Sequence, residues 1–285
     1  MVRIIVNGDD FGRSSSINQA IIRAHREGIL TSASLMITGE ATQEAIALIR
    51  QTPTLAVGLH LVAGAGRAIL PAHQIPHLVD KHGFFPNDAF SVGMHYAVSR
   101  RARSELRTEW RAQVEAFLST GLSLSHLDSH LHLHLHPALF LMLKSLAEEY
   151  GAAGIRIPRD DFWLAISHDR SRAGMKATWA IIFGLLSQWC VRQLRASRLI
   201  ITDRVYGLMQ TGQMTERYVV YLLHHIKAPL VEIYFHPAIE PANEPLGPNP
   251  GDLATLISPE VKRVVRERNL QLSTYLSIRK EAGHD

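Results

Sequence analysis

The sequence has a single cysteine, Cys190, and this scarcity excludes two common features. One cysteine cannot form an internal disulfide, and a structural zinc site built from four cysteines is impossible. No secretory signal is evident, because Met1-Val2-Arg3 leads directly into a strand-like run. We therefore expect a cytoplasmic protein, with enough apolar residues to bury a large core.

Lysine-rich tails and membrane-spanning runs are also missing. The 285 residues contain 30 basic and 26 acidic side chains, a net charge of +4, and arginine dominates the positive charge. Without a recognised binding motif or interleaved aromatic residues, nucleic acid is not an expected partner. The scattered arginines are better suited to peripheral contact with an anionic membrane surface.

Residues 177–191 are apolar but too short and too interrupted by Ser187-Gln188 to span a membrane. Two interpretations stay open. The segment can be an ordinary helix buried against a barrel, or a lipid-facing helix at the mouth of a site, with tryptophans at the membrane interface. Arginines flank it on both sides: Arg170, Arg172, Arg192, Arg195 and Arg198.

Strand-like runs alternate with helical patterns along the chain. Expected strands cover residues 2–6, 34–37, 55–59, 122–130, 155–157, 199–202, 230–235 and 270–275, and expected helices cover residues 16–27, 41–50, 105–119, 137–150, 176–195, 215–226 and 259–267. The alternation predicts a parallel α/β fold, and seven or eight such units in this length favour a (β/α) barrel over an open sheet. We expect one domain, residues 1–285, with loop insertions at about 61–100 and 159–195. The sequence indicates neither an oligomeric state nor whether 61–100 acts as a lid.

Polar residues follow six of the apolar runs at the point where each run ends. They are Asp9 with Asp10, His60, the segment Asp128-Ser129-His130, Arg156, Asp203 and His236. In barrels of alternating strands and helices, catalytic residues come from the C-terminal ends of several different strands. The repeated placement predicts one site assembled from the whole chain.

Asp9 and Asp10 are adjacent carboxylates directly after a buried strand. Two carboxylates so close repel each other unless a cation lies nearby, and a metal would allow one to be a ligand while the other is a base. The alternative is a helix-capping loop with solvated aspartates. The pair alone does not show which carboxylate has which role.

Between residues 126 and 136, histidines and Asp128 occupy the even positions, and leucines occupy most of the odd ones. In a strand this pattern places the polar groups on one face. At ~3.3 Å per residue, His130 and His136 would be ~20 Å apart, so at most two neighbouring members could reach one metal. The Asp128-Ser129-His130 part is the stronger candidate, and a histidine-rich surface strand is the alternative.

Three further side chains have both a structural and a functional interpretation. His60 is either a hydrogen-bonded core residue or a metal ligand. Pro237 stops the strand after His236, which would fix that imidazole where a general acid could stand. Arg156 either binds an anion or forms a surface salt bridge. Two histidines and one aspartate would leave open coordination positions, which is typical of hydrolytic metal sites.

Four of these segments together resemble the YdjC-like carbohydrate deacetylases. They are Asn7-Gly8-Asp9-Asp10-Phe11-Gly12, Val57-Gly58-Leu59-His60-Leu61, His126-Leu127-Asp128-Ser129-His130 and Phe235-His236-Pro237. The resemblance runs from residue 1 to about residue 237, and one departure is Gly8, where alanine is usual. Residues 58–71, 75–80 and 205–215 are similar to the branch associated with hopanoid biosynthesis.

The resemblance implies a barrel related to the polysaccharide deacetylases, with one divalent metal. The implied ligands are Asp10, His60 and His130, the implied base is Asp9, and the implied acid is His236. Zinc is the default for two imidazoles and a carboxylate, while magnesium, cobalt and nickel stay open. Asp128, His132 and Arg156 are expected to bind substrate or to support the ligands, with Asp128 orienting a ligand imidazole.

The implied reaction removes acetate from an N-acetylglucosamine unit carried on a hopanoid lipid. The alternative substrate is a soluble chito-oligosaccharide or another N-acetylated sugar. A barrel phosphoesterase is a rival, although such sites commonly collect more histidines and a second metal. A non-catalytic protein that binds membranes or nucleic acid would use the arginines and ignore the strand-end carboxylates.

Overall fold

The computed structural model describes residues 1–242, 244 and 246–283. Its strands are β1 (Arg3–Phe11), β2 (Ser32–Leu35), β3 (Ala56–Leu61), β4 (His126–Ser129), β5 (Gly154–Ile155), β6 (Arg204–Tyr206), β7 (Leu230–Phe235) and β8 (Gln271–Leu272). Its helices are α1 (Ser15–Glu27), α2 (Thr42–Arg50), α3 (Ala89–Val98), α4 (Arg100–Ser119), α5 (Pro137–Glu149), α6 (Phe162–His168), α7 (Ala173–Gln193), α8 (Glu216–His225), α9 (Pro250–Ile257), α10 (Pro259–Glu267) and α11 (Tyr275–Glu281), with a 3₁₀ helix η1 (His130–Leu135) after β4.

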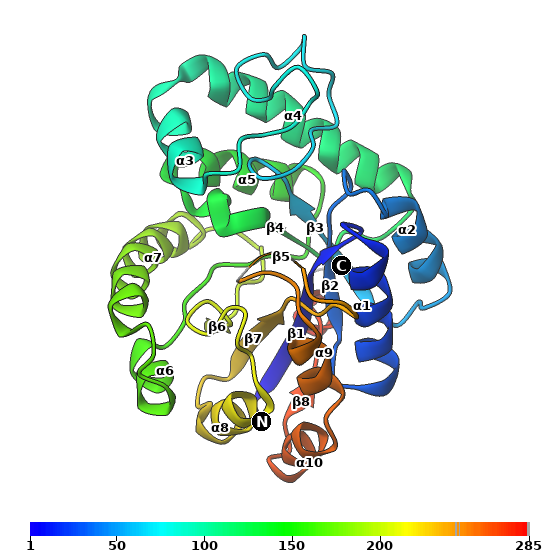
Figure 1. Ribbon diagram of the computed structural model, residues 1–285, viewed down its shortest axis with the longest axis vertical. Coiled ribbons are helices and arrows are strands. Elements are labelled where there is room, and N and C mark those ends of the chain that lie inside the picture. The colour runs from blue at the N-terminus through cyan, green and yellow to red at the C-terminus, as the bar shows by residue number, and fades with distance from the viewer. Residues whose placement is uncertain (243, 245, 284–285) are drawn as a thin grey trace.

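The strands form one parallel sheet in the order β5-β4-β3-β2-β1-β7-β6, which helices surround as an open barrel (Figure 1). Strand β1 is central. It pairs with β7 along residues 3–8, while its other edge is shared between β8 at Arg3 and Ile4 and β2 from Asn7 onward. Because all the strands run parallel, their C-terminal ends lie at one rim of the barrel. The predicted α/β barrel of seven or eight strand–helix units is confirmed.

The two edges of the barrel meet only loosely, between β5 and β6. Residues 199–202, predicted as a strand, make a single bridge between Ile200 and Gly154. The carbonyl of Thr202 accepts a hydrogen bond from the side chain of Arg159, at 2.5 Å from Nη2. Asp203 therefore precedes β6, and its carboxylate accepts the backbone N–H of Leu230. The prediction that Asp203 belongs with the strand-end residues is wrong.

Helix α4 fastens the long loop that follows β3. Glu109 is buried and accepts hydrogen bonds from the backbone N–H groups of Ile69 and Leu70, at 2.8 and 2.9 Å. Trp110 is also buried and donates from Nε1 to the carbonyl of Val62 at 3.1 Å. The loop lies against α4 through buried contacts, although residues 62–88 contain no helix or strand among the elements described.

Helix α3 lies inside the segment that the sequence predicted to be loops. Val92 and Tyr96 are buried, whereas Phe90, Met94 and Val98 on its other side are exposed. Apolar residues on both sides remove the helical periodicity on which the prediction depended. Helices α6, α9 and α11 were also missed, and each has only seven or eight residues, too few for a clear pattern.

Helix α7 was predicted, and its tryptophans pack against neighbouring residues of the protein. Trp189 packs edge-on against Phe140, with ring centroids 6.0 Å apart, and Trp179 packs beside a buried cluster that includes Tyr234. The side of α7 that faces solvent instead presents Ile181 and Leu185. Among the helices of the described residues, none has the length and hydropathy needed to cross a bilayer.

The segment after β6 is held by a half-buried carboxylate that sequence patterns did not indicate. Asp160 accepts the backbone N–H groups of Gly207 and Met209 at 3.2 and 2.8 Å. Gly207 has a φ of +132°, and a Cβ there would lie 2.7 Å from the carbonyl oxygen of Tyr234, so only glycine fits. Burial raises the pKa of Asp160 to about 6, although the two N–H groups oppose this shift.

This raised pKa predicts a pH-dependent stability. An unfolded carboxyl titrates near 3.8, so Asp160 contributes stability below about pH 4 that is lost as the pH rises through about 6. Asp160→Asn cannot ionise at this position. When the pH is raised from about 4 to about 7.5, its free energy of unfolding should therefore increase by about 2 kcal/mol relative to that of the wild type. Urea unfolding of both proteins at both pH values measures this difference. Any loss of hydrogen bonds that is the same at both pH values cancels when the two differences in the free energy of unfolding are compared. An identical difference at the two pH values would contradict the prediction.

Candidate metal centre and catalytic site

Side chains from five strands meet at the C-terminal rim of the barrel. Asp9 and Asp10 come from β1, His60 from β3, Asp128 from β4, His130 from the first position of η1, Arg156 from the residue after β5 and His236 from the residue after β7. All of them except His236 are buried. The structure thus brings together the strand-end residues that the sequence singled out, apart from Asp203.

A bulge in β1 explains how two consecutive aspartates reach the same site. In a regular strand, neighbouring side chains point to opposite faces. Between Gly8 and Phe11 the pairing of β1 with β2 shifts register, and Asp10 has a left-handed φ of 63°. Such bulges re-aim a side chain next to a functional site. Both carboxylates consequently join one cluster, and the alternative of two solvated capping aspartates is wrong.

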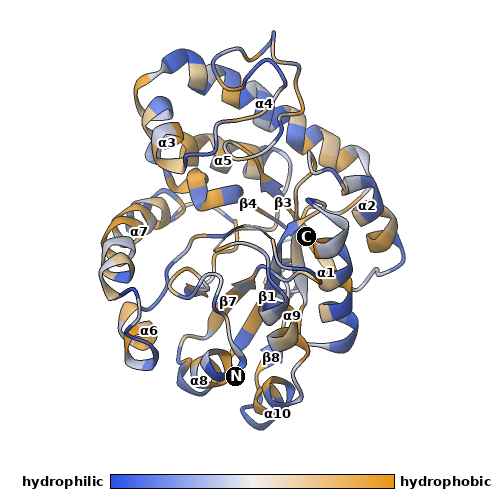
Figure 2. Cartoon of the chain, viewed as in Figure 1, coloured by the Kyte–Doolittle hydropathy of each residue, from blue (hydrophilic) through white to orange (hydrophobic). Residues whose placement is uncertain are grey.

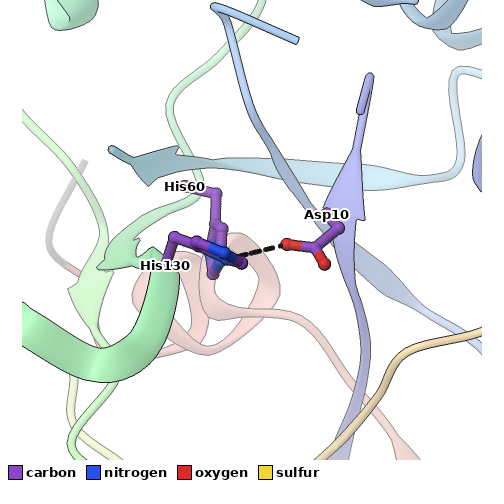
Figure 3. Close-up of side chains that lie close together, drawn as sticks. All are labelled: Asp10, His60 and His130. Carbon is purple, nitrogen blue, oxygen red and sulfur yellow. Dashed lines mark ion pairs between the residues drawn. The ribbon is translucent and has the colours of Figure 1, made fainter. Parts of the chain in front are cut away.

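Asp10, His60 and His130 form the most compact group of this cluster. Asp10 Oδ1 lies 3.1 Å from His130 Nδ1 and 3.6 Å from His60 Nε2. The two imidazole rings are edge-on, with centroids 5.6 Å apart. Figure 3 shows the three side chains directed toward one another from different elements. One donor atom from each lies within 4.8 Å of the others, a spacing that could hold a metal ion.

Asp128 orients the His60 ring. Its Oδ1 lies 2.8 Å from His60 Nδ1, which leaves Nε2 on the side of Asp10. Its Oδ2 accepts from Ser34 Oγ at 3.0 Å and lies 2.8 Å from Arg156 Nη1. Burial lowers the pKa of His60, but Asp128 and the two aspartates of β1 outweigh burial and raise it to about 9. The site therefore attracts a cation, either a proton or a metal.

The surroundings of Asp10 also favour a bound cation. Burial raises the pKa of Asp10, but the imidazoles of His130, His60 and His236 outweigh burial and hold the pKa well below its ordinary value. Asp10 Oδ1 is buried and receives no well-directed hydrogen bond, whereas Oδ2 lies 3.2 Å from Arg13 Nη1. An ionised carboxylate oxygen without a donor, facing two imidazole nitrogens, fits a metal ligand set.

Asp9 is bound differently from its neighbour. Both oxygens are held by Arg156, at 2.7 and 2.8 Å, and Asn7 Nδ2 donates to Oδ1 at 2.8 Å. Arg156 is fully buried and also donates from Nε to Glu232 at 2.8 Å. The interpretation of Arg156 as a surface salt bridge is therefore wrong. Its guanidinium is enclosed by carboxylates of the protein, so it is arranged to hold Asp9 in place.

A second possible group, made of Asp9, His60 and Asp128, is less suited to a metal. Arg156 already bridges its two carboxylates, and His60 Nδ1 is already hydrogen-bonded to Asp128. A guanidinium thus occupies the place that a metal would need. The donor set of Asp10, His60 and His130 fits a divalent ion better.

His236 lies beside Asp9 and is more exposed than the other members of the cluster. Its Nε2 is 3.9 Å from Asp9 Oδ2, and 18% of its side chain is exposed, against 2% for Asp9. The backbone N–H of His236 donates to Asp252 at 2.9 Å, which fixes the chain after β7. An imidazole so placed can reach both the cluster and an entering molecule.

The histidine repeat does not continue as a strand. β4 ends at Ser129, and Leu131 and His132 have φ values of 58° and 53°, which turn the chain into η1. Only His130 of the repeat contacts Asp10. The remaining histidines have separate structural contacts: His126 with Ser34, His134 with Ser129 and the Arg156 carbonyl, and His136 with the N–H of Ala138. The alternative of a histidine-rich surface strand is wrong.

His132 lies beside the site but outside the three-residue group. Its Nε2 is 3.1 Å from the hydroxyl of Tyr234, and its ring contacts Phe183 of α7 edge-on. Its Nδ1 is buried and has no hydrogen-bond partner. The residue therefore connects η1 to β7 and α7 near the cluster.

A cavity of about 800 Å³ adjoins the cluster at Arg13, the residue that contacts Asp10. Its lining includes Arg13, Met36, Gly66, Arg67, Phe84 and Glu240. The volume is within the range of small-molecule sites. The charged side chains can form hydrogen bonds with a polar ligand, and Phe84 can pack against the flat side of a ring in that ligand.

Some members of the network were missed from the sequence. Ser34 bonds Asp128, Asn7 and His126, while Glu232 bonds Arg156 and Tyr275. Glu232 could have been predicted from the sequence, because a charged residue in the middle of the apolar run 230–235 needs a hydrogen-bond or ion-pair partner when it is buried. Ser34 and Tyr275 could not have been predicted in this way, because their partners lie on strands that are distant in the sequence.

The fold and this cluster define an α/β barrel protein with a buried Asp/His group that could hold a metal at the C-terminal rim. The family described as YdjC-like protein matches residues 3–267. The chain belongs to this family, as its motifs predicted.

Two proteins are similar over nearly the whole chain, and a third is similar over about half of it. A carbohydrate deacetylase from Brevibacillus brevis is 31% identical over 280 residues, which is 96% of this chain and 98% of its own length. A carbohydrate deacetylase from Vibrio cholerae is 39% identical over 150 residues, 52% of this chain and 56% of its own length. A solved structure from Enterococcus faecalis V583, described as a proposed cellobiose-phosphate cleavage protein, superposes with a TM-score of 0.77 at 25% identity and covers 97% of this chain and 98% of its own.

Proposed function

We propose that this protein is a metal-dependent deacetylase that hydrolyses the N-acetyl group of a carbohydrate. The observation that carries the proposal is the buried group of Asp10, His60 and His130 beside Asp9 and His236. Similarity over nearly full length to a carbohydrate deacetylase supports the substrate class. The proposed ligands are Asp10, His60 and His130, and zinc suits this donor set, with magnesium, cobalt and nickel as alternatives.

A bound divalent metal would supply Lewis acidity for the amide carbonyl and for the attacking water. Asp9 accepts a proton from that water while Arg156 keeps the carboxylate in place. His236 donates a proton to the amide nitrogen as the C–N bond breaks, so that a neutral amine leaves. Asp128 holds the His60 ring so that Nε2 is presented to the site. Water and the acetamide are thereby converted to acetate and a free amino sugar.

The finer proposal is that the sugar is an N-acetylglucosamine unit carried on a hopanoid lipid. Its support is the likeness of residues 58–71, 75–80 and 205–215 to the hopanoid-associated branch, together with the exposed Ile181 and Leu185 of α7. Such a substrate would require the protein to work at the surface of a membrane. The alternative is a soluble chito-oligosaccharide, which the polar lining of the cavity would also accommodate.

Mass spectrometry distinguishes the two substrates. Metal-loaded protein is incubated with an N-acetylglucosaminyl hopanoid and, separately, with chitobiose. We expect loss of one acetyl group from the lipid. Loss from chitobiose alone would keep the reaction and exclude the lipid, and loss from neither, with metal bound, would contradict the proposed substrate class.

A further inference from the structure

Exposed apolar side chains gather on four neighbouring elements of the fold. Helix α3 contacts η1 and α5, and α7 contacts the same two elements. Eight of the fourteen large apolar side chains exposed in the described part of the chain belong to these elements. We call this surface the α3–α7 face; it consists of Phe90, Met94, Val98, Leu131, Leu141, Ile181, Ile182 and Leu185.

The α3 part of this face is the most exposed. Phe90, Met94 and Val98 follow one another at intervals of four residues, so they lie along one side of the helix. Their exposed fractions are 77%, 50% and 75%. In Figure 2, α3 and α7 lie along one side of the molecule with α5 beside α3, and α3 and α7 carry hydrophobic segments. Exposed apolar side chains gathered on neighbouring elements are typical of an interaction site.

The face continues from the rim of the cavity. Phe84 and Asn87 line the cavity, and α3 begins two residues after Asn87, with Asp88 as its N-cap. On the other side, Leu131 directly follows His130 and is 40% exposed. Whatever covers the α3–α7 face therefore lies next to the opening of the proposed active site.

The charged residues on the elements of the α3–α7 face are mainly basic, which favours an anionic partner. Residues 170–198 contain five exposed arginines and no acidic side chain, while Lys176 is buried and paired with Asp169. In η1 and α5 the acidic side chains are confined to Glu148 and Glu149 at the end of α5. At the end of α3, Arg100 and Arg101 are exposed, and Asp88 is the single acidic residue between positions 84 and 103. Apolar side chains bordered by arginines match a surface with an apolar interior and anionic headgroups.

We propose that the α3–α7 face docks on a bilayer that contains anionic lipid, with Phe90 and Met94 inserted at the level of the headgroups. The inference rests on the proposed function in one respect, that docking would turn the cavity opening toward a lipid-borne sugar. Binding itself requires no turnover. The apolar residues supply contact area and the arginines supply attraction to the headgroups, so neither alone should give full affinity.

Vesicle sedimentation tests the docking. The double variant Phe90→Glu/Met94→Glu is compared with wild type on vesicles of phosphatidylcholine with and without phosphatidylglycerol, and Leu272→Glu at the base of the barrel is the matched control. We expect wild type and Leu272→Glu to bind the anionic vesicles, and the double variant to bind at least ~10-fold more weakly. Arg100→Gln/Arg101→Gln should lose part of the dependence on phosphatidylglycerol. Unfolding temperatures show that each variant is folded.

Three outcomes would overturn the proposal. The wild type could fail to bind vesicles, or the double variant could bind as wild type does. The third is a wild-type dimer, measured by light scattering, that the double variant converts to a monomer without any vesicle binding, which would assign the face to a second copy of the chain. Deacetylation of a detergent-dispersed substrate separates docking from function. Activity without vesicle binding rejects docking alone, and vesicle binding without activity rejects the proposed function alone.

Discussion

His60→Ala and His130→Ala are each expected to lose the bound metal and nearly all activity. Each variant removes one of two imidazoles from a group of three donors, and the two donors that stay are too few to retain a divalent ion at the rim. The metal's contribution to the reaction is several kcal/mol, so kcat/KM should fall on the order of 10³-fold or more. Elemental analysis and acetate release, measured on the same samples, test both parts.

The control for these variants is His224→Ala, which removes an exposed imidazole on α8. It should keep both the metal and the activity of the wild type. Full metal occupancy in His60→Ala and His130→Ala would refute the assignment of these two residues as ligands. Loss of activity with full occupancy would show that they act on the substrate instead.

Replacing the two adjacent aspartates should give different results. Asp9→Asn removes the proposed base but leaves the three proposed ligands, so we expect unchanged metal content and a fall in kcat of about 10²- to 10⁴-fold. Asp10→Asn removes a ligand, so we expect loss of the metal as well as of the activity. The two variants are well matched, because each replaces an aspartate by asparagine and the two positions are adjacent in the same bulge of β1.

Elemental analysis and single-turnover acetate release distinguish these outcomes. Asp9→Asn also loses an ionic partner of the buried Arg156, so its unfolding temperature is measured alongside. If Asp9→Asn lost the metal and Asp10→Asn kept it, the roles of the two aspartates would be exchanged. Retained turnover in Asp9→Asn would remove that residue from the role of base.

The sequence predicted the barrel because strands and helices alternate regularly enough to be seen in one chain. It also predicted which residues lie at the C-terminal rim, since the end of an apolar run is a local feature and parallel strands carry all such ends to one side. Asp10, His60 and His130 span 120 residues of the chain, and the structure brings one donor atom of each within 4.8 Å of the others.

What the sequence could not predict depends on local geometry or on distant partners. The bulge that aims both Asp9 and Asp10 into the site leaves no pattern in the residue types, and neither does the left-handed turn at Leu131 and His132. The histidine repeat favoured a strand because its period is two, yet contacts of each histidine with a different partner decide its conformation. The bidentate pairing of Arg156 with Asp9 joins the residue after β5 to β1, which no local rule connects.

The most direct test of the account is acetate release by one preparation of the protein before chelation, after chelation and after zinc is restored, with an N-acetylglucosamine-bearing substrate. The account predicts that activity disappears with the metal and returns in proportion to zinc bound, up to one ion per chain. Acetate release that persists after the metal content has fallen to background would contradict the proposed role of Asp10, His60 and His130.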